Sequence, residues 1–369
     1  SDSKTHVASM QCGDFYGSEN SLSIAKDGQF KIELHTDAGE TILLKDYSPL
    51  QQGEIIDSAV MSKNALRDFL AVQIAEAKKN KLLLSVHLKA TMMKVSDPII
   101  FGHAVSVYFQ EVFNKYNSVF AELGINANNG LADLFSKLEK LPEKQKNTIR
   151  ADIQTCIDTN ASLAMVNSDQ GITNLHVPSD VIIDASMPAA IRSSGKMWGQ
   201  DGQLHDTLAI IPDRSYAGIY QQTIEFCKQH GAFNPTTMGT VQNIGLMAQK
   251  AEEYGSHDKT FEISTAGTVQ VIDDTGNCLL EQNVAQGDIW RMCQTKDIAV
   301  QDWVKLAVNR AQATGLDTVF WLDSQRAHDV QLTQKVRTYL AQYNVSELNI
   351  RIMSPKDAVN FSLAQIKAG

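Results

Sequence analysis

The 369-residue sequence lacks the patterns that mark several common protein classes. Its five cysteines, an odd number, include no C-x-x-C pair, which argues against zinc or a disulfide framework. No apolar run reaches 18 residues and the N-terminus is polar, so we expect no transmembrane helix, no signal peptide and a cytoplasmic location. The net charge of -9 argues against a general nucleic-acid-binding surface, which must neutralise phosphates.

Three motifs that carry chemistry are also missing. Neither G-x-G-x-x-G nor G-x-x-x-x-G-K-[ST] occurs, and H-E-x-x-H is absent. A standard dinucleotide turn and a phosphate-transferring α/β enzyme are therefore disfavoured. Histidines without ligand spacing are interpreted as structural: His87, His103, His176, His230 and His257.

The stretch of residues 85–98 organises the remaining pattern. Residues 82–86 form an apolar run with the length of a buried strand, so Lys89 falls where that strand leaves the sheet. Asp97 as N-cap and Pro98 as first helical residue predict a helix immediately afterwards. Because α/β sheets bind ligands beyond the carboxyl ends of their strands, Lys89 marks a candidate site.

The rest of the chain alternates between strand and helix signals. Residues 1–60 read as β-rich, with hairpin-type turn signals at 27–28 and 37–39, whereas 126–160 read as a polar helical insertion. Further strands are expected at 181–183, 208–211 and 350–353, and further helices from Ser62 and over 216–230 and 358–367. This alternation predicts an α/β fold with a largely parallel sheet and added β-hairpins.

An internal repeat relates the two ends of the chain. Residues 53–55 match 287–289, and other pairs keep the same separation of 234 positions. In that register Asp323 is the counterpart of Lys89. Two copies of one hairpin-helix-strand unit predict pseudo-twofold lobes. The expected division is lobe A at about 21–125, a central segment at about 126–254, and lobe B at about 255–369.

Residues 87–98, His-Leu-Lys-Ala-Thr-Met-Met-Lys-Val-Ser-Asp-Pro, closely resemble the catalytic-lysine segment of the bacterial monomeric NADP-dependent isocitrate dehydrogenases. The resemblance extends through 53–58, 165–169, 183–188 and 248–258. It implies a fold like that of the isocitrate and isopropylmalate dehydrogenases. Since the enzymes of that family are much longer, it also implies that residues 1–369 are their large domain, without the small domain, from a monomeric parent.

The resemblance assigns three site residues, each of which has an ordinary alternative. Lys89 is implied to contact isocitrate and serve catalysis, although most lysines are simply solvated. Tyr254 is implied to contact substrate as the catalytic acid, although a tyrosine after an amphipathic helix is usually a packing residue. Asp184 is implied to bind Mg²⁺ or Mn²⁺, although an aspartate before a helix often only caps it. For Asp323 and Asp329, capping or surface roles are favoured over metal binding.

The implied reaction is oxidation of isocitrate by NADP, loss of CO₂ to give 2-oxoglutarate, and protonation of the resulting enolate. The family's substrate-gripping serine, asparagine and arginines, its arginine-aspartate pair and its main NADP-binding residues are not in this chain. We therefore expect the isolated chain to be inactive. The alternatives are a non-catalytic binding or scaffold domain and an isopropylmalate-type dehydrogenase, the latter disfavoured by the long motifs above.

Overall fold

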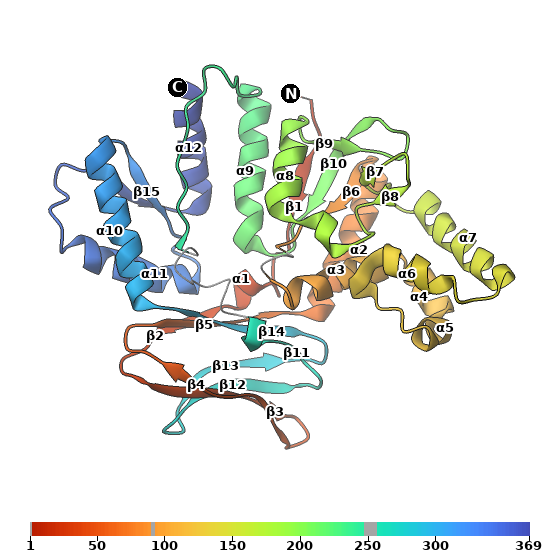
Figure 1. The fold of residues 1–369 in the computed structure, drawn as a ribbon, viewed down its shortest axis with the longest axis horizontal. Helices are drawn as coiled ribbons and strands as arrows, with labels where there is room; N and C mark the ends of the chain where they lie inside the picture. Colours follow the sequence, from red (N-terminus) through yellow and green to blue (C-terminus); the bar gives the residue numbers. More distant parts are fainter. Residues whose placement is uncertain (1, 90–92, 247–256) are drawn as a thin grey trace. The chain divides into compact units, whose positions relative to one another are not determined.

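The computed structural model describes residues 2–89, 93–246 and 257–369 (Figure 1). These residues form two compact units. Unit 1 comprises residues up to Gln11 and Asn64–Ala232, and unit 2 comprises Cys12–Lys63 and Phe233–Gly369. Unit 2 thus contains the hairpins of both repeat copies. Its boundaries follow this shared core, and they differ from the lobe boundaries expected from the order of the repeats.

Unit 2 is built on two four-stranded antiparallel sheets. The first has the order β11-β14-β5-β2 and the second β13-β12-β3-β4. Their bounds are β2 (Asn20–Ser23), β3 (Gly28–Thr36), β4 (Thr41–Leu50), β5 (Ile55–Met61), β11 (Thr260–Glu262), β12 (Gly267–Asp273), β13 (Cys278–Val284) and β14 (Ile289–Thr295).

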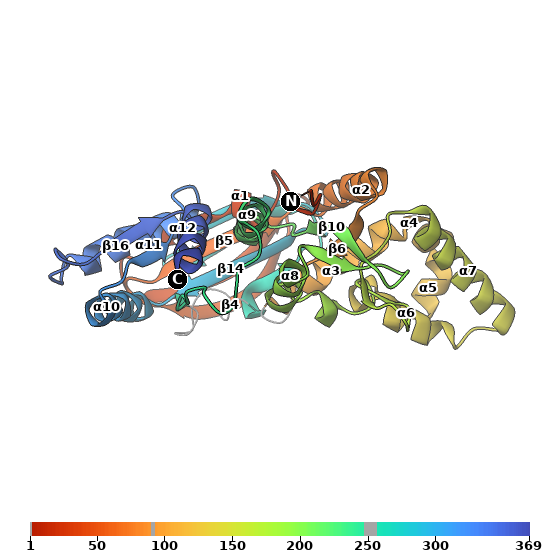
Figure 2. The same cartoon turned by 90° about the horizontal axis from the view of Figure 1, so that it is seen from above.

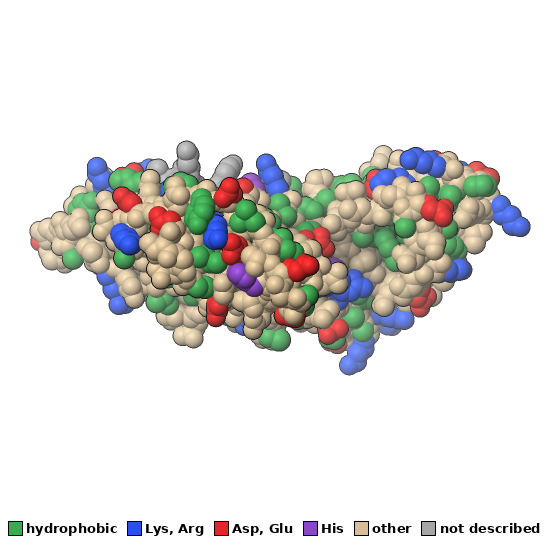
Figure 3. Space-filling view, turned by 90° about the horizontal axis from the view of Figure 1, so that it is seen from below, with side chains coloured by type: hydrophobic (Ala, Val, Ile, Leu, Met, Phe, Trp, Pro, Cys, Tyr) green, Lys and Arg blue, Asp and Glu red, His purple; other side chains and the backbone are tan. Residues whose placement is uncertain are grey.

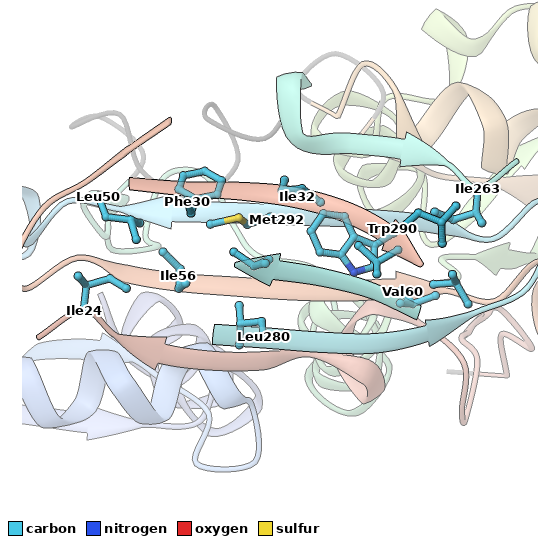
Figure 4. Packing of buried hydrophobic residues seen from close by; sticks show 14 residues of the cluster. Ile24, Phe30, Ile32, Leu50, Ile56, Val60, Ile263, Leu280, Trp290 and Met292 are labelled. Carbon is cyan, nitrogen blue, oxygen red and sulfur yellow. The ribbon is translucent and has the colours of Figure 1, made fainter. Parts of the chain in front are cut away.

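A hydrophobic core joins the two sheets face to face. Phe30 and Ile32 of β3 belong to one buried cluster with Ile56 of β5 and Trp290 and Met292 of β14, all labelled in Figure 4. Alternate residues of β3 are fully buried, as expected for strands with one apolar face. By contrast, β5 is buried at all seven positions, because the sandwich covers one face and helices cover the other.

The repeat predicted from the sequence is present in these elements. Strand β14 lies 234 positions after β5, and α10 (Asp297–Thr314) lies 234 positions after α2 (Lys63–Asn80). The buried residues of the two helices match in the same register, as Leu66 with Val300, Leu70 with Val304, Ile74 with Val308 and Ala77 with Ala311. The apolar periodicity of the two copies therefore specifies the same local structure twice.

The two copies also pair with each other. In the β5/β14 ladder Ser58 lies opposite Met292, its own counterpart in the repeat. The hairpin turn at 37–39 matches 274–276, a separation of 237 (274 − 37). At that separation Gln270 is the counterpart of Glu33, and the two lie opposite each other in the β3/β12 ladder. Both ladders are antiparallel, so these two residue pairs mark a pseudo-twofold axis through the sandwich.

Helices cover the outer face of the first sheet of unit 2. Ile55 on β5 packs into a second core with Val300 and Val304 of α10 and with Leu332 and Val336 of α11. The parallel pair of β15 and β16 lies beside these helices (Figure 2). The remaining bounds in unit 2 are α1 (Phe15–Ser18), 3₁₀ helix η4 (His257–Lys259), β15 (Thr318–Trp321), α11 (Ala327–Leu340), β16 (Ile350–Met353) and α12 (Pro355–Ala368).

Unit 1 contains a mixed sheet in which β10 lies between two parallel neighbours, β1 and β6, and continues into antiparallel β9, β7 and β8. The strands are β1 (His6–Ala8), β6 (Leu83–Val86), β7 (Met165–Asn167), β8 (Ile172–Thr173), β9 (Lys196–Trp198) and β10 (Leu204–Ile210). The helices after α2 are α3 (Ser96–Tyr108), α4 (Gln110–Lys115), α5 (Asn117–Glu122), α6 (Gly130–Leu138), α7 (Glu143–Thr159), α8 (Ile183–Arg192) and α9 (Arg214–His230), with 3₁₀ helices η1 (Ala127–Asn129) and η2 (Pro178–Val181).

The α/β class is confirmed, but parallel pairing is less extensive than expected. It is confined, among the named strands, to β1–β10–β6 and β15–β16. The reason is the sandwich, whose ladders are antiparallel throughout. The turn signal at 37–39 joins the paired strands β3 and β4, whereas residues 27–28 connect β2 to a strand of the other sheet.

Two local predictions were wrong. The expected strand at 181–183 is instead the end of η2, a single bridge between Ile182 and Leu88, and the start of α8. Asp97 is the second residue of α3 and not its N-cap, because the helix begins at Ser96. An apolar run of three residues is too short to distinguish a strand from a buried helix start.

The described residues contain no helix that is both long and apolar enough to cross a membrane. On the face drawn in Figure 3, lysine and arginine side chains are interspersed with aspartate and glutamate. Both signs of charge are therefore mixed on this face.

The sandwich core yields a matched stability test. Leu34 of β3 is completely buried, whereas Leu43 of the neighbouring β4 is 54% exposed. We predict that Leu34→Ala lowers the free energy of unfolding by about 2–5 kcal/mol through lost burial and a residual cavity. Leu43→Ala should change it by no more than about 0.5 kcal/mol. Urea denaturation followed by tryptophan fluorescence measures both, and equal effects would contradict this description of the core.

Candidate functional site

The strand that leads to Lys89 is hydrogen-bonded along both edges. His87 donates its backbone N–H to Ile210 at the end of β10. On the opposite edge, every second residue pairs through both its backbone N–H and its C=O. Leu84 pairs with the backbone of Ser162 and Ala164. Val86 pairs with the side-chain amide of Asn174, and Leu88 pairs with the backbone of Val181 and Ile183. The backbone is therefore held up to the residue before Lys89.

Asn174 replaces a strand residue in this arrangement. Its Oδ1 accepts from the Val86 N–H at 2.6 Å and its Nδ2 donates to the Val86 carbonyl at 3.3 Å. The side chain is 1% exposed, so the Val86 backbone groups would otherwise be buried without these partners. A carboxamide suits this position because it offers one acceptor and one donor on the same planar group.

Lys89 forms an ion pair with Asp184. Its Nζ lies 2.7 Å from Oδ1 and 2.9 Å from Oδ2 of the carboxylate. The lysine side chain is 13% exposed and the aspartate side chain 52% exposed. The ammonium is thus largely covered, while much of the carboxylate faces solvent and remains accessible to a ligand.

The position of Asp184 argues against the alternative that it only caps a helix. It is the second residue of α8, and the N-cap position is Ile182, which makes no side-chain capping bond. Both carboxylate oxygens are directed to Lys89 instead. A carboxylate in the first turn is still favoured by the helix dipole, so the local structure supports a negative charge there.

Tyr220 of α9 is electrostatically coupled to Asp184. Burial, and to a smaller extent the negative charge of Asp184, raises the pKa of Tyr220 to about 12. The ring packs against a core that contains Ile183 and Met187 of α8. Tyr220 is therefore a neutral phenol at pH 7.

Beneath the ion pair lies a buried histidine with two hydroxyl partners. Ser85 Oγ is 2.6 Å from Nε2 of His87, and Ser186 Oγ is 2.7 Å from Nδ1. The imidazole is 0% exposed, and burial lowers the pKa of His87 to about 3. It is neutral at pH 7, so one ring nitrogen donates and the other accepts. The interpretation of His87 as a structural, hydrogen-bonded histidine agrees with this geometry.

Tyr254 lies outside the described residues, but its counterpart in the repeat is described. Residues 254–256 read Tyr-Gly-Ser, and so do residues 16–18. Tyr16 donates its hydroxyl to Oδ2 of Asp323 at 2.9 Å. Tyr16 thus contacts the residue that is the repeat counterpart of Lys89.

Asp323 and Asp329 have structural roles in unit 2. Asp323 Oδ1 accepts from the Gln325 backbone N–H, and its own N–H donates to Asp329 Oδ2. Asp329 is buried, in the first turn of α11, and its carboxylate also lies 3.6 Å from Arg326. These bonds hold the turn before α11 and do not cap the helix, whose N-cap is Arg326 without a side-chain capping bond; Asp329 is also not at the surface.

Asp184 has the chemistry of a ligand for a hard divalent cation. Mg²⁺ and Mn²⁺ prefer oxygen donors, and Mg²⁺ often takes only one or two protein carboxylates. Within residues 2–89, 93–246 and 257–369, no cluster of three or more His, Cys, Asp or Glu forms a complete metal cage. An exposed carboxylate that is already balanced by a cation fits a partial site, in which other oxygens complete the coordination.

The fold and site together define an α/β protein with an internally repeated β-sandwich and a lysine-carboxylate pair at a strand end. A family model described as "Monomeric isocitrate dehydrogenase" matches residues 1–369. The chain therefore belongs to the monomeric isocitrate dehydrogenase family.

Curated relatives give the same assignment. The chain is 61% identical over 368 residues to "Isocitrate dehydrogenase [NADP]" of Azotobacter vinelandii and 57% identical to "Isocitrate dehydrogenase [NADP] 2" of Colwellia maris. It is 50% identical to a relative with that second name from Mycobacterium tuberculosis. Each alignment covers 100% of this chain but 49–50% of the relative, so the chain spans about half the length of these proteins.

A solved structure is also similar, but weakly. It is an isocitrate dehydrogenase from Ostreococcus tauri in complex with isocitrate and magnesium(II). The alignment covers 97% of this chain and 65% of that chain, with 8% identity and a TM-score of 0.33. The assignment to the family rests on the sequence relatives and does not depend on this likeness.

Several of the residues described above were not identified from the sequence. Tyr16 could have been found, because the Tyr-Gly-Ser triplet occurs in both repeat copies. Ser85 precedes His87 by two positions, which places both on one face of a strand, but nothing in the sequence connects them to Ser186. Asn174 lies in a loop, where its role depends entirely on the tertiary fold.

The buried histidine predicts a specific pH dependence of stability. At pH 5 an unfolded histidine is largely protonated, whereas His87 stays neutral in the fold, so the unfolded state binds more protons. Stability is therefore fully present above about pH 6.5 and falls as the pH drops toward 3, by up to about 1.4 kcal/mol per pH unit. His87→Gln should reduce this slope in urea denaturation between pH 7 and 5. An unchanged slope would contradict the assignment.

Proposed function

We propose that this chain is the part of a longer NADP-dependent isocitrate dehydrogenase that contains Lys89, Asp184 and Tyr254. The reaction is oxidation and decarboxylation of isocitrate to 2-oxoglutarate with reduction of NADP. The observation that carries the proposal is the Lys89–Asp184 ion pair, located at the strand end whose sequence resembles the family's catalytic-lysine segment. The names of the relatives support the substrate and the cofactor.

The ion pair suits a ligand that brings both signs of charge. Isocitrate carries carboxylates, and its hydroxyl and a carboxylate can chelate a divalent cation. When such a chelate binds, the Lys89 ammonium can exchange Asp184 for a substrate carboxylate, and Asp184 can exchange the ammonium for the cation. Each charged group keeps a partner, which avoids the large cost of leaving a partly buried charge unpaired.

Within this proposal the residues have distinct roles. Lys89 holds the substrate and assists removal of the hydroxyl proton, and Asp184 provides an oxygen ligand for Mg²⁺ or Mn²⁺. A bound divalent cation supplies Lewis acidity toward the oxygen at which negative charge develops. NADP binding is assigned to companion segments of the longer polypeptide.

Tyr254 is proposed as the acid that returns a proton to the product carbon. Two observations support the choice. Its Tyr-Gly-Ser triplet repeats that of Tyr16, and Tyr16 contacts Asp323, the counterpart of Lys89. Pairing a phenol with a lysine favours proton exchange, because the ammonium lowers the cost of forming a phenolate.

The first test measures NADPH formation from isocitrate with Mn²⁺. This chain, extended to the length of its relatives, should be active, and the isolated chain should be inactive because essential positioning and cofactor contacts are missing. Lys89→Met in the extended chain should lower kcat by about 10²-fold or more. Lys94→Met is the matched control, because Lys94 is exposed and no role is assigned to it. Activity retained in Lys89→Met would refute the proposal, and an inactive extended chain would favour the non-catalytic scaffold.

The second test separates the two Tyr-Gly-Ser triplets. Tyr254→Phe in the extended chain should lower kcat by about 10²-fold or more, because a proton donor in the transition state is lost. Tyr16→Phe removes the hydrogen bond to Asp323 and should cost about 1 kcal/mol of stability while kcat is retained. Equal losses of kcat in the two variants would contradict the division of roles.

A further inference from the structure

The serine-histidine-serine chain connects the two elements that carry the ion pair. Ser85 and His87 belong to the strand segment that ends at Lys89, and Ser186 belongs to the helix that carries Asp184. The distances of 2.6 and 2.7 Å make both contacts full hydrogen bonds. His87 therefore connects strand β6 to the first turns of α8 through its side chain.

A second connection between the same elements is made by the backbone. The Ile183 N–H donates to the Leu88 carbonyl at 2.7 Å. In sequence order, Asp184 lies between this backbone bond at Ile183 and the side-chain bond at Ser186. The Leu88 N–H also donates to the Val181 carbonyl, so the backbone bonds hold the chain only up to Ile183, before Asp184. Two bonds on either side of Asp184 restrict the position of its carboxylate relative to Lys89.

The neutral state of His87 suits this role. The backbone N–H and C=O groups around it are paired along the sheet, and its two ring nitrogens have hydroxyl partners, one at each end. Serine hydroxyls can donate or accept, so the chain stays hydrogen-bonded in either tautomer. A charged partner in this place would compete with Lys89 for the Asp184 carboxylate, whereas a neutral imidazole does not.

We propose that His87 is a positioning residue of the site, which acts through Ser186 to hold the Asp184 carboxylate opposite Lys89. The consequence for ligand binding rests on the proposed function; the consequence for the ion pair itself does not. Residues that orient a metal-binding side chain typically change metal affinity or activity by about 10–100-fold when they are removed.

The test compares two serine-to-alanine variants that each remove one partner of the same imidazole. Ser186→Ala disconnects α8 from His87, whereas Ser85→Ala leaves that link intact. His87 is 0% exposed, so each variant leaves a buried ring nitrogen without its hydroxyl partner. Ser85 is also 0% exposed whereas Ser186 is partly exposed, so water replaces the lost hydroxyl less readily in Ser85→Ala. A purely structural role for His87 therefore predicts that Ser85→Ala has at least as large an effect as Ser186→Ala on every measurement.

The first measurement uses this chain alone and does not depend on catalysis. Brief acetylation of surface and cleft lysines, quantified by peptide mass spectrometry, reports how freely each amine reacts. Ser186→Ala should increase acetylation of Lys89 severalfold relative to Lys94, because a loosely held carboxylate protects the amine less. Ser85→Ala should leave this ratio near that of the unmodified chain, and Ser186→Thr, which keeps a hydroxyl, should restore it.

The second measurement uses the extended chain with Mn²⁺ and isocitrate. Ser186→Ala should raise KM for isocitrate and the half-saturating Mn²⁺ concentration about tenfold with a smaller change in kcat, and Ser186→Thr should recover most of the loss. Matching effects of Ser85→Ala and Ser186→Ala on Lys89 acetylation would overturn the inference. If acetylation responds as expected but the unmodified extended chain turns over no isocitrate, the positioning role stands and the proposed function fails.

Discussion

The antiparallel pairing of β5 with β14 is the constraint on which unit 2 depends. Because Ser58 lies opposite Met292, each copy of the repeat contributes one of the two central strands of the same sheet. Both strands are largely buried on both faces, so neither copy could leave the sheet without exposing apolar surface. The repeat therefore acts as one folding core and not as two independent domains.

This constraint also explains the local conformations at the start of the two central strands. Gly53 and Gly287 occupy equivalent positions with φ of +85°, and each donates its N–H to the carbonyl of Ile24 or Ile263 in its own copy. A Cβ at Gly53 would come within 2.9 Å of the Asp297 side chain, which is held by Lys335 and Tyr339. Glycine is required there by both backbone conformation and close approach.

Much of the fold was predictable because the internal repeat encodes the same strand and helix elements in two copies. The two helices after the sandwich strands have buried residues in identical register, and a repeat of that kind is visible without any structure. Pairing partners were less predictable. Residues 181–183 are as apolar as a short strand, and they do pair with Leu88, but only through a single bridge before the chain turns into α8. Which neighbour pairs with a short segment is decided by tertiary structure.

The candidate site was predictable in part, because two of its residues lie in recognisable sequence motifs. Lys89 and Asp184 come from segments 95 positions apart, and their motifs, not their spacing, identified them. His87 could be identified as structural, but its connection to Ser186 depends on how α8 packs on the strand. Asn174 is a stronger case, because a loop asparagine that completes a strand edge has no sequence signature.

The two copies of the repeat differ in the residue that follows the equivalent strands, which is Lys89 in one copy and Asp323 in the other. Asp323 in unit 2 is satisfied by its own surroundings, with the Tyr16 hydroxyl and the Gln325 amide on its carboxylate. Lys89 in unit 1 has as its partner a carboxylate that remains half exposed. The Asp323 carboxylate already accepts hydrogen bonds from a hydroxyl and an amide, whereas an ion pair with an accessible carboxylate can exchange partners. Under the proposed function, the lysine in one copy and the aspartate in the other assign ligand binding to the strand end that carries Lys89.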